Sequence, residues 1–306
     1  MQRNLYSYLD RAGHDLVFSG SRDLGLSPME RTRGLLRGFR PAAGGVDVYL
    51  STVPPLPFGT KAPLMTIVCD LRWLRTRSKL GSAYRAWDLR RSIRRSNSIL
   101  CISQHTLSDL ISFEASAAAK AWYHWLGPGQ ITVESFCSSG SGLLLIVGGA
   151  PHKRNEHAAA VLVEARPEWL RGIIGVGVSD QVRNSLSGAF PCEWHQTVSD
   201  TGLVQLYERA DYFMMLGTDE GFGLPFVEAL TSGCQVIATD HPLAREIVGS
   251  SGILLQPGVL GDQASQLYQR PQVELAVRRD HARKFSWIEF GKAVEKELSR
   301  IADPSR

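Results

Sequence analysis

Two glutamates, Glu220 and Glu228, lie eight positions apart on either side of a glycine-rich turn. Pro225 stands between them at a point where a helix can begin, because the fixed φ of proline suits the first helical turn. Such a turn presents the backbone N–H groups of residues 222–224 at the positive end of the helix, which suits sugar or phosphate oxygens. Glu228, one turn in, can accept hydrogen bonds from two sugar hydroxyls. The spacing therefore predicts a site for a sugar or a phosphate.

A second candidate site follows an apolar run in the second half of the chain. Gly148 and Gly149 come directly after that run, and two cations, Lys153 and Arg154, precede the next helical pattern. Cations in such a place can neutralise charge on a leaving nucleotide. The order predicts a diphosphate clamp. The alternative is that this Lys-Arg pair is an ordinary solvated helix start.

The sequence of residues 219–229 resembles the signature EGFGLPxxEA of the retaining GT-B glycosyltransferases of family 4. Other pieces resemble that family in the same order: the helix before the motif at 198–210, "SGxPVIxSD" at 232–240, "xEVVG" at 245–249 and "FSW" at 285–287. The clamp resembles "VGGxxPRKN", with Lys153 in the Arg position and Arg154 in the Lys position. Because Arg and Lys differ in reach and fork geometry, the resemblance leaves open which of them touches phosphate.

This resemblance implies roles for the residues of both sites. Glu228 would hold the ribose of a nucleotide-diphospho-sugar, Glu220 would contact the transferred sugar, and Lys153 with Arg154 would bind the diphosphate. His195, after Trp194, lies where the family contacts the nucleotide base. The implied catalytic residues are Glu220, Lys153 and Arg154, and the implied donor-binding residues are Gly148, Gly149, Phe222, Gly223, Leu224, Glu228 and His195.

The first half of the chain resembles the family less closely. Residues 66–71 are similar to "VxTIHDL", but Cys69 stands where the family has a His near the donor sugar, which implies a changed sugar preference or a relaxed activity. Ser103 resembles a serine that begins a helix facing the cleft, and the competing interpretation is a plain N-cap. The implied acceptor-side residues are Cys69, Asp70 and Ser103. Residues 5–17 already resemble the family's first helix and second strand, so we expect a chain that is short at its N-terminus or natively trimmed.

Short β-branched runs alternate with helical patterns along the chain, which predicts parallel βα units. In the first half, strands are expected at 15–19, 46–50, 64–69, 98–102 and 131–136, with helices at 80–96 and 104–120. In the second half, strands are expected at 143–147, 173–178, 212–215, 235–238 and 253–255.

We therefore predict an α/β protein of the GT-B type, with two doubly wound Rossmann-like domains facing a cleft. A small, polar linker at 135–142 separates the two halves. The acceptor-side domain would be 1–138 and the nucleotide-sugar domain 139–306, with the last helix either staying there or returning to the first domain.

Length and composition agree with two soluble domains. The chain has 306 residues, of which 43% are hydrophobic and 21% charged, ordinary values for a globular protein. No apolar run approaches the roughly 20 residues that span a bilayer, and the polar start is not a signal peptide. We expect a cytoplasmic protein. Its five cysteines have no Cys-x-x-Cys spacing, which predicts reduced thiols.

Positive charge gathers in the first half. Residues 1–135 hold 18 Lys and Arg against 10 Asp and Glu, whereas residues 136–306 hold 16 against 20. Much of the excess lies between Arg72 and Arg95, opposed only by Asp88. One interpretation is a solvated helix face. The other is a surface that meets anionic lipid, on the inner face of a membrane, or a phosphate-bearing acceptor. No recognisable nucleic-acid module accompanies these residues, so nucleic acid is not expected as a partner.

Other chemistries find less support in the sequence. Asp-x-Asp, the metal motif of the other large glycosyltransferase fold, is absent, so we expect no metal and no further cofactor. Residues 175–180 form a broken dinucleotide fingerprint, with Asp180 in place of the last glycine. A glycosidase pair needs carboxylates about 5 to 9 Å apart across an open cleft, and a glutamate within a helix beside a phosphate-type turn is poorly placed for that.

The combined interpretation is a retaining, metal-independent hexosyltransferase. It would move a hexose from a nucleotide-diphospho-sugar to a glycan or lipid-linked acceptor, in cell-surface polysaccharide or lipopolysaccharide assembly. The alternative is a non-catalytic GT-B module that binds a nucleotide-sugar or serves as a partner subunit. A GT-B epimerase is a third interpretation. The sugar, the base and the acceptor stay open.

Overall fold

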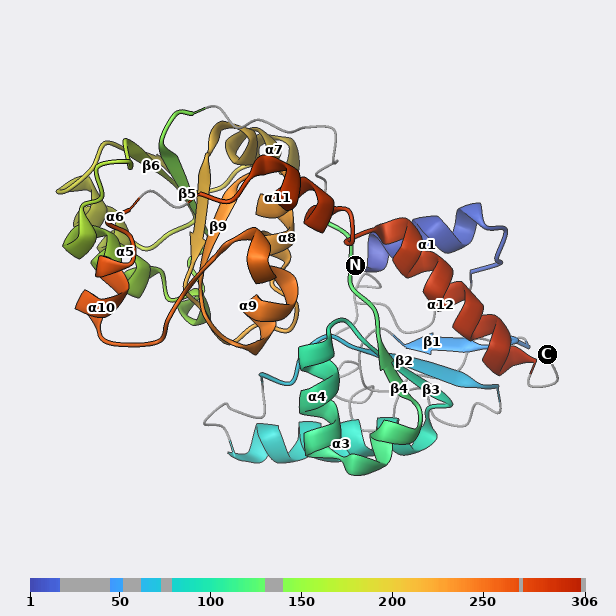
Figure 1. The fold of residues 1–306 in the computed structure, drawn as a ribbon. Helices are drawn as coiled ribbons and strands as arrows, with labels where there is room; N and C mark the ends of the chain where they lie inside the picture. Colours follow the sequence, from blue (N-terminus) through green and yellow to red (C-terminus); the bar gives the residue numbers. More distant parts are fainter. Residues whose placement is uncertain (17–44, 52–61, 73–78, 130–139, 270–271, 304–306) are drawn as a thin grey trace. The chain divides into compact units, whose positions relative to one another are not determined.

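The computed structural model describes residues 1–16, 45–51, 62–72, 79–129, 140–269 and 272–303 (Figure 1). The chain divides into two compact units. Unit 1 comprises Met1–Leu126 and Trp287–Arg306, and unit 2 comprises Gly127–Ser286. The predicted boundary at 138/139 lies outside the described residues.

Unit 2 contains a six-stranded parallel sheet with strand order β10-β9-β8-β5-β6-β7. Its strands are β5 (Leu143–Val147), β6 (Gly172–Val176), β7 (Cys192–His195), β8 (Tyr212–Met215), β9 (Gln235–Thr239) and β10 (Ile253–Leu255). The order runs outward from β5 in both directions, the doubly wound pattern whose ligand sites lie at the carboxyl ends of the strands.

Helices cover both faces of this sheet (Figure 1). On one side lie α5 (Asn155–Ala165), α6 (Asp180–Ser187) and α10 (Leu260–Ser265). On the other lie α7 (Asp200–Arg209), α8 (Leu224–Thr231), α9 (Pro242–Ile247) and α11 (Leu275–Ala282). The short 3₁₀ helices η3 (Pro151–Lys153) and η4 (Gly249–Ser251) lie in connections. Because both faces are covered, the inner strands β8 and β9 are buried along their whole length, which explains their nearly continuous apolar sequences.

Unit 1 contains, among the described residues, a four-stranded parallel sheet in the order β1-β2-β3-β4. Its strands are β1 (Tyr49–Ser51), β2 (Leu64–Val68), β3 (Ser98–Cys101) and β4 (Ala121–Tyr123). The helices α1 (Gln2–Arg11) and α12 (Trp287–Ala302) lie on one side, and α3 (Lys79–Arg95) and α4 (Gln104–Phe113) on the other; η2 (Ala115–Ala119) follows α4 (Figure 1).

The last helix, α12, packs closely against the first helix, α1. A side chain at Gly291 of α12 would clash with the ring of Tyr8 on α1, so glycine lets the two helices approach. The Tyr8 hydroxyl donates a hydrogen bond to Glu295 at 3.0 Å. The end of the chain therefore packs in unit 1.

Several predicted elements differ from the observed ones. The strand expected at 46–50 starts only at Tyr49, and the helix expected at 104–120 ends at Phe113, after which η2 follows. The strands β4 and β7 were not predicted. Each lies at the edge of its sheet and is incompletely buried; β7 has a mixed sequence, Cys-Glu-Trp-His, and β4 has only three residues. The strand expected at 131–136, and most of the one at 15–19, lie outside the described residues.

Two further observations concern the described part of the chain. None of its helices combines the length and the apolar character needed to cross a membrane. Four cysteines are free thiols there: Cys69, Cys101, Cys192 and Cys234.

Candidate functional site

The turn between the two glutamates depends on Gly223, a position that favours glycine. Gly223 has a φ of 72°, in the left-handed region, and a Cβ atom there would clash with the Phe226 ring. Gly223 caps the N-terminus of α8, which begins at Leu224 with Pro225 in its first turn. The predicted helix start is confirmed. The Phe222 side chain is buried and packs edge-on against Phe285, so the side chain itself is not available to a ligand.

Glu228 lies one turn into α8, as predicted, and its carboxylate is enclosed. The Tyr207 hydroxyl of α7 donates a hydrogen bond to Glu228 Oε2 at 3.1 Å. On the other side, a Cβ atom at Gly129 would clash with Glu228 Oε1, so the backbone at Gly129 lies directly against the carboxylate. Burial raises the pKa of Glu228 to about 7, although Tyr207 and Lys153 both act to lower it.

Glu220 lies in the loop before α8 and has a different partner. His152 Nε2 and Glu220 Oε1 are 3.1 Å apart, and 29% of the His152 side chain and 14% of the Glu220 side chain are exposed. The loop that contains His152 packs closely against the loop before α8. A Cβ atom at Gly217 would clash with the His152 carbonyl, so the absence of a side chain there allows this approach. Sequence reasoning missed His152. The available signal was its position directly before the two cations of the clamp.

The clamp loop follows β5 and brings Lys153 toward the glutamates. Gly148 has a φ of 85°, and the Lys153 side chain folds back over it to donate a hydrogen bond from Nζ to the Val147 carbonyl at 3.0 Å. Burial lowers the pKa of Lys153, whereas the negative charges of Glu220 and Glu228 act to raise it. Lys153 therefore lies within the electrostatic reach of both carboxylates.

The rest of the clamp is shaped by close backbone contacts. A Cβ atom at Gly149 would clash with the Gly177 carbonyl, so the loops after β5 and β6 touch there. Arg154 has a left-handed φ of 54° at the N-cap of α5, and its side chain is exposed. The structure thus brings Lys153, Glu220 and Glu228 together with His152. It gives Arg154 no contact with either glutamate.

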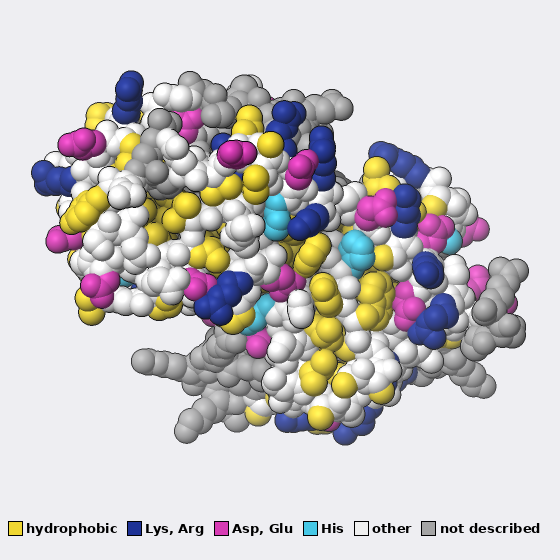
Figure 2. All heavy atoms as spheres, viewed as in Figure 1, with side chains coloured by type: hydrophobic (Ala, Val, Ile, Leu, Met, Phe, Trp, Pro, Cys, Tyr) yellow, Lys and Arg dark blue, Asp and Glu magenta, His cyan; other side chains and the backbone are white. Residues whose placement is uncertain are grey.

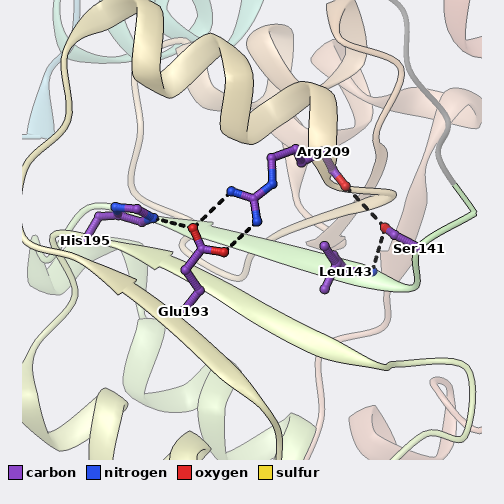
Figure 3. Close-up of polar contacts among 5 residues, drawn as sticks. All are labelled: Ser141, Leu143, Glu193, His195 and Arg209. Carbon is purple, nitrogen blue, oxygen red and sulfur yellow. Dashed lines mark hydrogen bonds and ion pairs between the residues drawn. The ribbon is translucent and has the colours of Figure 1, made fainter.

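His195 lies at the carboxyl end of the edge strand β7, in a separate polar cluster (Figure 3). Its Nε2 atom is 2.7 Å from Glu193 Oε1. Arg209 of α7 makes two hydrogen bonds to the Glu193 carboxylate, at 3.0 and 2.6 Å, and these bonds hold the pKa of Glu193 down at about 2. The Arg209 carbonyl also accepts a hydrogen bond from Ser141, which in turn accepts one from the Leu143 amide (Figure 3).

The three predicted acceptor-side residues all lie in unit 1. Cys69 follows β2, and burial raises the pKa of its thiol to about 11. Asp70 accepts hydrogen bonds from the Arg72 amide at 3.1 Å and guanidinium at 3.2 Å. Ser103 is the N-cap of α4, where its hydroxyl accepts a hydrogen bond from the Thr106 amide at 3.0 Å. The N-cap interpretation of Ser103 is confirmed.

A metal site is not found in the described part of the chain. No group of three or more His, Cys, Asp and Glu side chains there has an arrangement that could hold a metal ion.

Part of unit 2 matches a known protein family. Residues 144–269 match the family described as Glycosyl transferases group 1. This segment runs from β5 to four residues beyond α10 and contains the clamp, His195 and both glutamates.

Two relatives from Escherichia coli match parts of the chain. An O-antigen chain mannosyltransferase B is 32% identical over 96 residues, which cover 29% of this chain and 25% of the relative. A serotype-specific mannosyltransferase WbdA is 26% identical over 188 residues, 48% of this chain and 23% of the relative. The chain thus covers about a quarter of the length of these relatives.

Solved structures match over more of the chain. AviGT4, a glycosyltransferase involved in avilamycin A biosynthesis, superimposes with a TM-score of 0.59 at 15% identity, covering 98% of this chain and 88% of that one. Anabaena Alr3699/HepE in complex with UDP and glucose superimposes with a TM-score of 0.59 at 19% identity, covering 78% of this chain and 72% of that one. These likenesses establish the fold. The chain has the GT-B fold, and residues 144–269 of its second Rossmann-like unit match the Glycosyl transferases group 1 family.

Proposed function

We propose that the chain is a glycosyltransferase that moves a hexose from a nucleotide-diphospho-sugar to a glycan or lipid-linked acceptor, with retention of anomeric configuration. The observation that carries the proposal is the arrangement in unit 2, where the clamp loop that holds Lys153 meets the loop before α8 through the 3.1 Å contact between His152 and Glu220. The cation of this site offers a group for a diphosphate, and the two carboxylates offer groups for the hydroxyls of sugars.

Each residue has a role in this reaction. Glu228 accepts hydrogen bonds from the donor ribose, Glu220 contacts the transferred hexose, and Lys153 neutralises the diphosphate. Arg154, which is exposed, can reach the diphosphate from outside the clamp. His195, at the end of β7, contacts the nucleotide base.

The chemical step exchanges one bond at the anomeric carbon for another. The bond from that carbon to the phosphate oxygen breaks, and a bond to the acceptor oxygen forms on the same face. The acceptor proton moves to the leaving phosphate oxygen, and the nucleoside diphosphate departs. The positive charge of Lys153 stabilises this leaving group as its negative charge develops.

The names of the relatives favour a polysaccharide product. Both are bacterial mannosyltransferases, and one is an enzyme of O-antigen chains. Mannose donors are therefore the first to test, and cell-surface polysaccharide assembly at the cytoplasmic face of a membrane is the setting that we propose.

The proposal is tested by binding and then by transfer. A thermal-shift screen of UDP-, GDP- and dTDP-sugars should identify a stabilising donor, because a ligand that binds only the folded state raises its stability. Transfer with that donor should persist in EDTA, and NMR of the product should show the donor's anomeric configuration. Binding without hydrolysis or transfer to any glycan acceptor would instead support the non-catalytic module. Activity lost on chelation and restored by Mg²⁺ would contradict the proposed metal independence.

We also propose that α3 faces a membrane surface. Two of its basic side chains form ion pairs within the protein, so fewer of them can contact lipid than the sequence alone indicates. Lys and Arg side chains lie along the lower edge of unit 1 in Figure 2, where Figure 1 places α3. Arg90 pairs with Glu114 at 3.4 Å, and Arg91, with 12% of its side chain exposed, pairs with Asp88 at 3.5 Å. Trp87 is 48% exposed. Tryptophan favours the membrane interface, so it adds an anchor that the charge pattern did not indicate.

Binding to vesicles tests this surface. Each exposed basic residue adds up to about 1 kcal/mol of attraction to anionic lipid. Cosedimentation with anionic vesicles should fall with added salt, with Arg94→Gln and with Trp87→Ala. Equal binding to neutral and anionic vesicles would leave α3 as a solvated helix face.

A further inference from the structure

Tyr207 is a buried residue whose side chain has one polar group, a hydroxyl that points toward Glu228. None of the residue is exposed, and its ring packs against Phe213 with centroids 5.8 Å apart. Its backbone carbonyl accepts a hydrogen bond from the Cys234 thiol at 3.2 Å. The ring is therefore fixed in place, and its hydroxyl reaches across from α7 to Glu228 on α8.

The direction of this hydrogen bond is set by chemistry. Burial raises the pKa of Tyr207 well above its ordinary value, so the phenol keeps its proton and acts as the donor. The phenol therefore donates to Glu228, whose carboxylate in the ionised form can accept with all four of its lone pairs. The bond from Tyr207 uses one lone pair of Oε2, and the others remain available for the hydroxyls of a ligand.

The other groups around Glu228 do not fix its orientation in this way. Lys153 favours the charged carboxylate from the clamp loop, and Asp200, at the start of α7, opposes it. Gly129 contributes only backbone beside Oε1. Among these neighbours, Tyr207 is the side chain that makes a hydrogen bond to the carboxylate.

We propose that Tyr207 is a positioning residue for donor binding: its hydroxyl orients the Glu228 carboxylate for the two hydroxyls of the donor ribose. The inference rests on the proposed function, because it assigns Glu228 to the ribose. It predicts that a residue with no contact to the nucleotide controls both the affinity for nucleoside diphosphate and the pH at which that affinity is lost.

The test replaces the hydroxyl and nothing else. Calorimetry with UDP, GDP and dTDP identifies the nucleoside diphosphate that binds, and its affinity is then measured from pH 6 to pH 9. Wild-type affinity should fall as the pH drops through about 7, where Glu228 takes up a proton. Tyr207→Phe should bind about tenfold more weakly at pH 7. Its midpoint should move to higher pH, because the lost hydrogen bond had favoured the charged carboxylate.

Two further variants make the result specific. In a Glu228→Gln background, Tyr207→Phe should cause little additional loss, since a residue that acts through Glu228 has no separate effect once the carboxylate is gone. Tyr212→Phe is the matched control. Tyr212 is equally buried but begins β8, at the opposite end of that strand from the carboxyl-end loops, so its variant should keep wild-type affinity and pH midpoint. Melting temperatures of all variants report on folding.

The outcomes separate this inference from the proposed function. If Glu228→Gln leaves nucleoside diphosphate binding unchanged, the ribose assignment of Glu228 fails, and the role of Tyr207 fails with it. If Glu228→Gln abolishes binding but folded Tyr207→Phe binds like wild type with the same pH midpoint, the proposed function stands and the inference about Tyr207 is wrong. If Tyr207→Phe weakens binding equally in the wild-type and Glu228→Gln backgrounds, Tyr207 acts on the fold and the inference is again wrong.

Discussion

The two glutamates of one short motif occupy contrasting environments. Glu228 lies within α8, enclosed by the Tyr207 hydroxyl and the Gly129 backbone. Glu220 lies in the loop before the helix, where it contacts His152, whose side chain is partly exposed. A carboxylate on a helix, fixed by a buried phenol, suits the part of a donor that stays bound throughout the reaction. A carboxylate on a loop suits the part that is transferred. The contrast therefore supports the proposal that Glu228 binds the nucleotide and Glu220 the moving sugar.

Alanine at each glutamate gives the largest effects expected from this contrast. Glu228→Ala should weaken free nucleoside diphosphate and intact donor alike, because losing a charged hydrogen-bond partner costs about 1.5 to 3 kcal/mol. Glu220→Ala should leave nucleoside diphosphate binding nearly unchanged and should lower turnover about 100-fold, since even small misplacement of the reacting group costs this much. Calorimetry and steady-state kinetics on both folded variants measure the difference. Equal loss of nucleoside diphosphate affinity in the two variants would erase the distinction between the carboxylates.

The enclosure of Glu228 also predicts an effect on stability. Burial raises its pKa from the ordinary 4.5 to about 7. Between these pH values the unfolded chain has released a proton that the folded chain retains, so this residue lowers stability as the pH rises through the window, and the loss is complete above pH 7. Glu228→Gln removes the titration. The variant should be more stable than wild type by about 3 kcal/mol at pH 8 and by nearly nothing at pH 4.

Urea unfolding of wild type and of Glu228→Gln at the two pH values measures this difference. If Glu228→Gln were equally destabilised at both pH values, the carboxylate would be stabilising in the charged form, and the enclosure would not act as described.

The sequence predicted some elements around the site and missed others, for physical reasons. The start of α8 could be read from Gly223 and Pro225, because a left-handed turn and a first-turn proline are local requirements. The central strands of unit 2 could be read because burial on both faces demands continuous apolar runs. The edge strand β7 could not, since its residues are only half-buried.

The partners of the glutamates depend on long-range packing, which no local pattern records. Tyr207 precedes Glu228 by 21 residues, and the bond between them depends on how α7 and α8 lie on the sheet. His152 is even further from Glu220 in the chain, and the two meet through the loops after β5 and β8. Sequence reasoning could name both glutamates, but it could not say which partner each of them has.

His152 offers the finest test of the comparison, with the smallest expected effect. Its contact with Glu220 is partly exposed, and exposed pairs of this kind contribute about 0.2 to 1 kcal/mol. His152→Gln should therefore lower turnover by about fivefold at most and should leave nucleoside diphosphate affinity unchanged, because the histidine acts on the glutamate assigned to the sugar. In a Glu220→Ala background the same substitution should have no further effect on turnover. His157→Gln is a suitable control, since His157 lies on α5 and contacts Gln263 instead of the motif. If His152→Gln weakened nucleoside diphosphate binding as Tyr207→Phe is expected to, the two partners would serve one shared function, and the division between a fixed and a mobile end of the motif would be wrong.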